Sequence, residues 1–253
     1  MSRTYEALKR AERGRRNGAG SGPVPAGPAP VAATEVEGTR VAYERLRVWI
    51  TSPPPGDDGA EHGIQTVLVV GCHARSGATT VATRLASTLA AKTDARVLLV
   101  DANLRRPCLD RVFGLPAGPG LRQALNGSGP AVREQPTASP NLFVLTAGHD
   151  LRDAGDVLDS HDVERLLAHL RPRFDHIIVD TAPLLDFPDA YALARNVDAV
   201  VLVVEAERTP VDTARRIAQD LRHLGTQRIG VVLNRQRDYI PRFLRRLVSS
   251  VAS

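Results

Sequence analysis

The residues best suited to chemistry lie in three polar segments that each follow a hydrophobic strand candidate. The first is the loop GCHARSGATT (71–80), and the other two begin with Asp101 and Asp180. A loop of small residues between a strand and a helix presents backbone N–H groups that bind phosphate. An aspartate at the end of a neighbouring strand can hold Mg²⁺, often through water. Together the three segments predict a site for a nucleotide phosphate and a magnesium ion.

Individual side chains in these segments have different expected roles. The loop residues expected to contact ATP or ADP are Arg75, Ser76, Gly77, Ala78, Thr79 and Thr80. The hydroxyl of Thr79 can bind Mg²⁺, and Asp101 and Asp180 are its further expected ligands and the expected catalytic groups. A single aspartate after a strand is often only a turn or cap residue. The prediction therefore depends on all three segments occurring in this order.

An alternation of strands and helices would bring the three segments together. Strand candidates are 66–70, 96–100, 142–145, 176–179, 199–203 and 229–233. Helix candidates are 79–91, 120–126, 159–170, 189–196 and 211–224. Short apolar strands separated by helices predict a doubly wound α/β fold, with a mostly parallel sheet of six to seven strands covered on both faces. Ligands of such sheets bind at the carboxyl ends of the strands.

The chain divides by composition into an N-terminal arm and one larger domain. Residues 1–34 combine a short amphipathic helix with a Gly/Pro/Ala-rich flexible linker. The domain spans 35–253, with a helix at 35–51 and a core at 64–236. Its basic amphipathic end, 240–251, predicts either a helix packed on the sheet or one that binds a membrane surface or partner. Asp189 is expected to cap the helix that begins near Ala190.

Composition excludes several classes of protein. The net charge is +5, but Lys9 and Lys92 are the only lysines among 33 basic residues, which indicates a coding bias toward arginine rather than specific nucleic-acid binding. Cys72 and Cys108 are too few for a disulfide framework and are expected to be free thiols. The longest apolar runs are strand-sized, and the N-terminus has no apolar leader, so we expect a cytoplasmic protein.

Several phrases of the sequence match one family in order. They are RVLLVDANLRRPCLDRVFGLP (96–116), GLRQAL (120–125), LFVLTAG (142–148), FDHIIVDTAPLLDFPDA (174–190) and IGVVLNR (229–235). Through them, residues 35–236 resemble the bacterial tyrosine kinases (BY-kinases) of capsule and exopolysaccharide systems. These belong to the Walker-type P-loop NTPases, with the partitioning and septum-site proteins. The resemblance implies ATP or ADP with Mg²⁺ as cofactors and places Asn234 where the family contacts adenine, although Asn234 also suits a turn.

The chain departs from the family at the positions that carry catalysis. Ala78 stands where the family has the lysine of its phosphate loop, and Arg75 replaces a loop glycine. Asn103 replaces the second acid of the Asp-x-Asp pair, where it can still contact the cofactor. The C-terminal tyrosine cluster is reduced to Tyr239. Together these changes predict a pseudokinase with weakened or lost ATP turnover.

As a pseudokinase, the chain would regulate or scaffold a membrane chain-length protein (polysaccharide copolymerase) or an intact BY-kinase, at the inner face of the plasma membrane. Oligomer formation is in doubt, because the family's Glu-x-x-Arg-x-x-Arg assembly pattern reads Val41, Glu44 and Arg47 here. One alternative is an active kinase in which Arg75 or Arg105 replaces the lysine. Another is a partitioning-type switch, which the missing signature lysine disfavours.

Overall fold

The computed structural model describes residues 37–52, 63–126, 133–150, 158, 160–226 and 228–236. The expected N-terminal helix and linker (1–34), the basic helix at 240–251 and Tyr239 lie outside these residues. The proposed division into an arm and a domain therefore stays a prediction.

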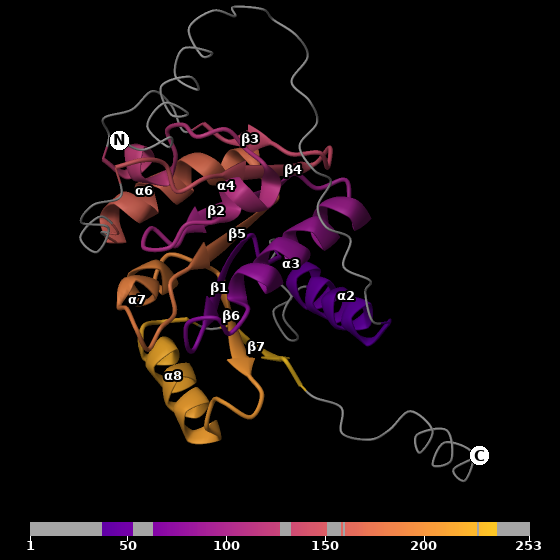
Figure 1. The fold of residues 1–253 in the computed structure, drawn as a ribbon, viewed down its shortest axis with the longest axis vertical. Helices are drawn as coiled ribbons and strands as arrows, with labels where there is room; N and C mark the ends of the chain where they lie inside the picture. The colour runs from indigo at the N-terminus through magenta and orange to yellow at the C-terminus, as the bar shows by residue number, and fades with distance from the viewer. Residues whose placement is uncertain are drawn as a thin grey trace, which may run out of the picture.

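A seven-stranded sheet forms the centre of the described chain, with the strand order β3-β4-β2-β5-β1-β6-β7 (Figure 1). The strands are β1 (Thr66–Gly71), β2 (Val97–Ala102), β3 (Gln135–Pro136), β4 (Leu142–Leu145), β5 (His176–Thr181), β6 (Ala199–Glu205) and β7 (Arg228–Asn234). Every pairing is parallel except that of β3 with β4. The predicted doubly wound α/β fold is confirmed, and the six expected strands are all present.

Helices cover both faces of the sheet (Figure 1). They are α2 (Glu37–Thr51), α3 (Ala78–Lys92), α4 (Leu109–Phe113), α5 (Leu121–Leu125), α6 (Ser160–Leu170), the 3₁₀ helix η2 (Arg171–Arg173), α7 (Asp189–Ala194) and α8 (Val211–His223). Residues of α2, α3 and α4 pack against one face, and residues of α5, α6, α7 and α8 against the other. No helix within the described ranges has the length and apolar character needed to cross a membrane.

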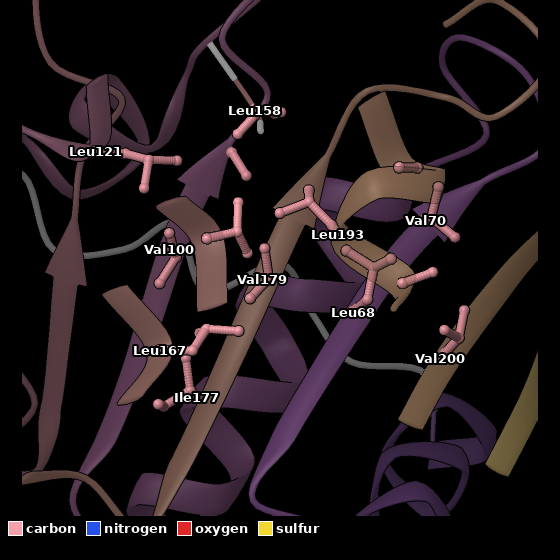
Figure 2. Packing of buried hydrophobic residues seen from close by; sticks show 14 of the residues in the cluster. Leu68, Val70, Val100, Leu121, Leu158, Leu167, Ile177, Val179, Leu193 and Val200 are labelled. Atoms are coloured by element: carbon pink, nitrogen blue, oxygen red, sulfur yellow. The ribbon is translucent and has the colours of Figure 1, made fainter. Parts of the chain in front are cut away.

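Alternating strand residues divide the core into two layers. Leu68 and Val70 of β1 face the layer that contains α6, α7 and α8, where Ile177 and Val179 of β5 lie beside them (Figure 2). Val67 and Val69, their neighbours in sequence, face α2 and α3 instead. Every residue of β1, β2 and β6 is buried, as expected for parallel strands covered on both faces. The rigid central strands β1, β2 and β5 therefore position the polar residues at their carboxyl ends.

Candidate functional site

The segment between β1 and α3 forms a phosphate-type loop around a hollow of about 310 Å³. The backbone turns back on itself where the Ser76 N–H donates to the His73 carbonyl at 3.2 Å. Gly77 precedes α3 with a φ of +93°, and no side chain caps this helix N-terminus. The first N–H groups of α3 are therefore available to an anion, which is the basis of phosphate binding by such loops. The hollow is lined by Gly71, His73, Ala74, Arg75, Ser76, Gly77, Ala78, Thr79, Thr80, Asn103, Thr181, Pro183 and Arg235.

Residues from the ends of other strands hold the loop in place. Asn234, the last residue of β7, donates its Nδ2 to the Ser76 carbonyl at 2.8 Å. Arg208, beyond β6, donates to the Ala74 carbonyl at 3.3 Å. After β5, the Asp186 carboxylate accepts the Ala74 N–H at 3.3 Å. The loop is thus fixed by side chains that lie more than 100 residues away in sequence.

Gly77 is a position where the loop requires glycine, and Gly77→Ala should lower the free energy of unfolding by about 1–2 kcal/mol. Its φ of +93° strains any other residue, and an added Cβ would lie 2.2 Å from Asn234 Nδ2. Displacing Asn234 would also break its bond to Ser76. Urea unfolding beside Gly118→Ala tests this expectation, since Gly118 has no atom within 4 Å of the new Cβ. Equal losses in the two variants would contradict the role assigned to Gly77.

Asp101 and Asp180 lie opposite each other on the paired strands β2 and β5. Asp101 is 1% exposed and accepts the N–H groups of Cys108 (2.9 Å), Leu109 (3.0 Å) and Asn103 (3.2 Å). Burial raises the pKa of Asp101 to about 6, although these N–H groups act in the opposite direction. The carboxylate of Asp101 therefore organises the segment that leads into α4, and neither Asp101 nor Asp180 is among the residues that line the hollow.

Asp180 is fully buried, and burial raises its pKa to about 8. The nearby Thr79 hydroxyl lowers this pKa and the Asp101 carboxylate raises it. No described group completes a hydrogen bond with either carboxylate oxygen of Asp180. A buried carboxylate with two unpartnered oxygens fits a cation, because a positive charge would offset its desolvation.

The donor set here suits a partly hydrated magnesium ion bound together with phosphate. Asp180 and Thr79 lie together, and both offer the oxygen atoms that Mg²⁺ prefers. Among the described residues, no group of three or more His, Cys, Asp or Glu side chains could hold a metal ion. The cation would therefore need water and phosphate oxygens to complete its coordination. This is how nucleotide-bound Mg²⁺ is usually held.

The expectation that Asp189 caps helix α7 is wrong. Pro188 occupies the cap position, and no side chain caps this terminus. Asp189 is 4% exposed and binds the Arg105 guanidinium through both oxygens, at 2.8 and 3.1 Å. The same guanidinium lies 4.2 Å from the centre of the Phe187 ring. The Asp189 carboxylate therefore forms a bidentate ion pair with Arg105 instead of capping the helix.

The structure brings most of the predicted nucleotide contacts to one place. The hollow is lined by residues 75–80 and Asn103. Asn234 does not line it but donates a hydrogen bond to the Ser76 carbonyl of the loop. Arg105 does not line the hollow. Arg235 was missed by the sequence analysis, although it is a cation that directly follows the last strand. It lines the hollow while pairing with Glu205 at 2.8 Å.

Both cysteines are free thiols, as predicted. Cys108 lies beside the site, where burial raises its pKa to about 11 and the Asp101 and Asp180 carboxylates act in the same direction. A thiol with such a high pKa carries little thiolate at neutral pH, so Cys108 is not an activated nucleophile.

Three curated relatives are kinases or polysaccharide-system proteins, and no family model matches the chain. Tyrosine-protein kinase ptk of Acinetobacter johnsonii is 28% identical over 77% of this chain and 26% of its own length. Putative tyrosine-protein kinase CapB of Staphylococcus aureus is 28% identical over 70% of this chain and 77% of its own. Succinoglycan biosynthesis transport protein ExoP of Rhizobium meliloti is 33% identical over 63% of this chain and 21% of its own length. The chain thus spans about a quarter or less of the length of two of them.

Solved structures share the fold over most of the described chain. The VpsO kinase domain is 30% identical over 78% of this chain and 98% of its own, with a TM-score of 0.65. The chimerical protein CapA2B2 has a TM-score of 0.67 at 24% identity, and the match covers 78% of this chain and 84% of CapA2B2. The septum site-determining protein MinD of Pyrococcus horikoshii was solved as a complex with Mg-ADP. It has a TM-score of 0.60 at 21% identity, and the match covers 73% of this chain and 76% of MinD. The last two matches show the fold alone. Because the VpsO kinase domain is matched over nearly its whole length at 30% identity, this chain belongs to the bacterial tyrosine kinase (BY-kinase) family of P-loop ATPases.

Proposed function

We propose that this chain is a BY-kinase-like pseudokinase of exopolysaccharide or capsule biosynthesis and export. It keeps a nucleotide cradle but transfers phosphate weakly or not at all. The relatives that bear kinase names, and the one named for succinoglycan biosynthesis transport, support the biological setting. The loop around Ala78 supports the loss of catalysis.

Ala78 is the observation on which the proposal depends most. It begins α3 and lines the hollow, where a lysine would reach the terminal phosphates. Lys92 ends the same helix, about 21 Å away along the helix axis, and pairs with Glu44 at 3.8 Å. It cannot serve the loop. A missing stabiliser of transition-state charge typically reduces the rate by about 100- to 1000-fold.

The remaining residues could still bind a nucleotide. A bound Mg²⁺–ATP would supply the phosphoryl group and the charge of the cation. The N–H groups at the start of α3 would hold the phosphates, and Thr79 with Asp180 would hold the cation. Asn234 holds the loop in the conformation that would accept a phosphate, through its hydrogen bond to the Ser76 carbonyl. These contacts support weak binding of ATP more strongly than they support its turnover.

An active kinase with an arginine in place of the lysine is the second candidate function. Arg75 and Arg235 both line the hollow, so a guanidinium could reach a bound phosphate. Arg105 is the weaker candidate, because Asp189 and Phe187 already engage its guanidinium. If an arginine acts as surrogate, Arg75→Ala or Arg235→Ala should abolish turnover.

For partners, we infer a membrane chain-length protein or a catalytically intact BY-kinase, with recruitment to the inner face of the plasma membrane. The match to MinD adds no support for a partitioning-type switch, because it concerns the fold alone.

Phosphotyrosine formation tests the proposed loss of catalysis. The purified chain incubated with Mg²⁺–ATP should gain no phosphotyrosine, measured by antibody and by mass spectrometry. The VpsO kinase domain, treated in parallel, serves as the positive control for the assay. Phosphotyrosine that accumulates on the chain with time, and disappears in Asp180→Asn, would contradict the pseudokinase proposal and favour the arginine surrogate.

A further inference from the structure

Strand β7 forms one edge of the sheet, and the apolar side chains on one of its faces are exposed (Figure 1). Val231 and Leu233 of this strand are 61% and 55% exposed. They lie beside Leu202 and Val204 of β6, which are 0% and 7% exposed. Paired residues of neighbouring parallel strands point to the same face. The two exposed side chains therefore extend the buried layer that contains α8 beyond its last covered strand.

The opposite face of β7 is covered. Trp49 of α2 lies over it, so that a Cβ added at Gly230 would be 3.2 Å from the tryptophan ring. Val232 packs against the buried layer that contains α2 and α3. On the exposed face, α8 covers β6 with the buried Ile217 and Leu221. A further element beside α8 would cover the apolar surface that remains on β7.

The sequence that follows β7 carries an apolar stripe at helical spacing. Five apolar residues outside the described ranges make up this stripe: Phe243, Leu244, Leu247, Val248 and Val251. Separations of three and four residues place all five on one side of a helix. The arginines at positions 242, 245 and 246 fall on the opposite side. Pro241, just before the stripe, suits the first position of a helix.

The place of this segment in the chain favours β7 as the surface that it covers. Strand β7 ends at Asn234, so residues 235–240 connect it to Pro241, which is an ordinary length for the loop between a strand and a helix. A helix over 241–251 would be about 16 Å long, at about 1.5 Å per residue. The strand itself extends over about 23 Å, at about 3.3 Å per residue. The segment can therefore turn back along the strand that it follows.

We propose that residues 241–251 form a helix that packs beside α8, with its apolar stripe covering Val231 and Leu233. Burying the two apolar surfaces against each other is favoured over leaving both in water. The arginines of the segment then face solvent, where their charge needs no partner. With its stripe buried, this segment does not anchor the chain in a lipid surface, so recruitment to the membrane has to come from a protein partner.

Hydrogen–deuterium exchange of the full chain, without lipid or partner, tests the contact. Amides of 243–251 should exchange at least about 10-fold more slowly than in a free peptide of the same sequence. Leu233→Asp places a charge on the docking face and should remove this protection. Val41→Asp, at a valine of α2 that is 47% exposed, should retain it. Fast exchange in the unmodified chain, or unchanged protection in Leu233→Asp, would overturn the proposal.

A matched pair of substitutions within the segment tests the contact from its other side. Leu247→Asp should remove the protection, because it places a charge in the apolar stripe. Arg246→Asp, one residue earlier and on the opposite side of the helix, should retain it. The two variants leave β7 unchanged, so this comparison holds even if Leu233→Asp disturbs the strand. Equal protection in the two variants would contradict the proposed docking.

Other occupants of the face give different results. If a membrane takes up the stripe, protection should appear only with phosphatidylglycerol vesicles, and the unmodified chain should sediment with them as strongly as Leu233→Asp. If a second copy of the chain covers β7, protection should fall on dilution. Either result would overturn the proposal, which expects protection at all concentrations and several-fold more sedimentation of Leu233→Asp than of the unmodified chain. No measurement here uses a nucleotide, so the outcome is independent of the proposed pseudokinase function.

Discussion

Ala78→Lys should raise the affinity of the chain for ATP by about 10- to 150-fold, the range that corresponds to one charge-assisted contact of about 1.5–3 kcal/mol. Residue 78 is the first residue of α3 and lines the hollow of the loop. A lysine there would extend toward the phosphates that the first N–H groups of the helix bind. The backbone needs no change, because Gly77 already has the left-handed conformation that precedes the helix. Isothermal titration with ATP and Mg²⁺ measures the difference.

Ala42→Lys is the matched control for this experiment, because it makes the same substitution at an exposed position of α2. It changes the net charge equally but leaves the loop untouched, so its ATP affinity should equal that of the unmodified chain. Equal, tight binding by the unmodified chain and Ala78→Lys would show that the chain does not need the lysine. Absence of binding by both would show that the loop no longer accepts a nucleotide.

The central strands could be predicted from the sequence because buried strands appear there as continuous apolar runs. Strands covered on both faces are continuous apolar runs, and all six expected strands appear in the sheet. Their ends were placed too early, since β2, β5 and β6 continue into Asp101, Thr181 and Glu205. A polar residue inside a buried strand has no signature in a hydrophobicity pattern. Strand β3 was not predicted, because an element of two residues is too short to show a period, and helix α4 was not predicted either.

The site could be predicted at the level of strand ends but not of side-chain partners. Asp101 and Asp180 face each other because β2 and β5 pair in register, which follows from the fold class. Arg105 and Asp189 are 84 residues apart, and their ion pair follows from neither local propensity nor motif. The Asp189 prediction was wrong for this reason, since an acid before a helix is locally a good cap. Three-dimensional packing overrode that local preference.

The loop illustrates the same limit. Seven of the residues predicted from the sequence, 75–80 and Asn103, line the hollow, yet the sequence could not show what holds the loop in place. Asn234 bonds the Ser76 carbonyl and Arg208 the Ala74 carbonyl, both through side chains from distant strand ends. These contacts persist although the lysine is missing. The cradle therefore does not depend on the lysine for its shape, which is why a single substitution at residue 78 is a meaningful test.

Asp180 should make the chain less stable as the pH rises from about 4 to 8. Burial raises the folded-state pKa of this aspartate from 3.8 to about 8. The folded state therefore binds a proton that the unfolded state releases. A raised pKa on an acid contributes stability that is fully present below the unfolded value and is lost as the pH approaches the folded value. The slope is at most about 1.4 kcal/mol per pH unit, so the total loss is several kcal/mol.

Asp180→Asn should remove most of this slope, because the amide cannot ionise. Urea unfolding in EDTA at pH 5, 6.5 and 8.5 would show the variant more stable than the unmodified chain at pH 8.5, with little difference at pH 5. Mg²⁺ in place of EDTA should flatten the slope of the unmodified chain, since a bound cation offsets the buried charge. A parallel pH dependence of the two proteins in EDTA would contradict the raised pKa.

Asp101→Asn is the informative comparison, because Asp101 is buried and has a raised pKa as Asp180 does, but its carboxylate is hydrogen-bonded. Asp101 accepts three backbone N–H groups, from Asn103, Cys108 and Leu109, which stabilise its charge. An amide nitrogen placed among these donors cannot accept them, so the lost hydrogen bonds, about 1–3 kcal/mol, should offset the gain from removing a buried charge, and Asp101→Asn should be less stabilising than Asp180→Asn at pH 8.5. If both variants were stabilised at that pH, desolvation would outweigh hydrogen bonding at both carboxylates. Opposite signs would show that the hydrogen-bond partners, rather than burial alone, determine what each buried carboxylate contributes to stability.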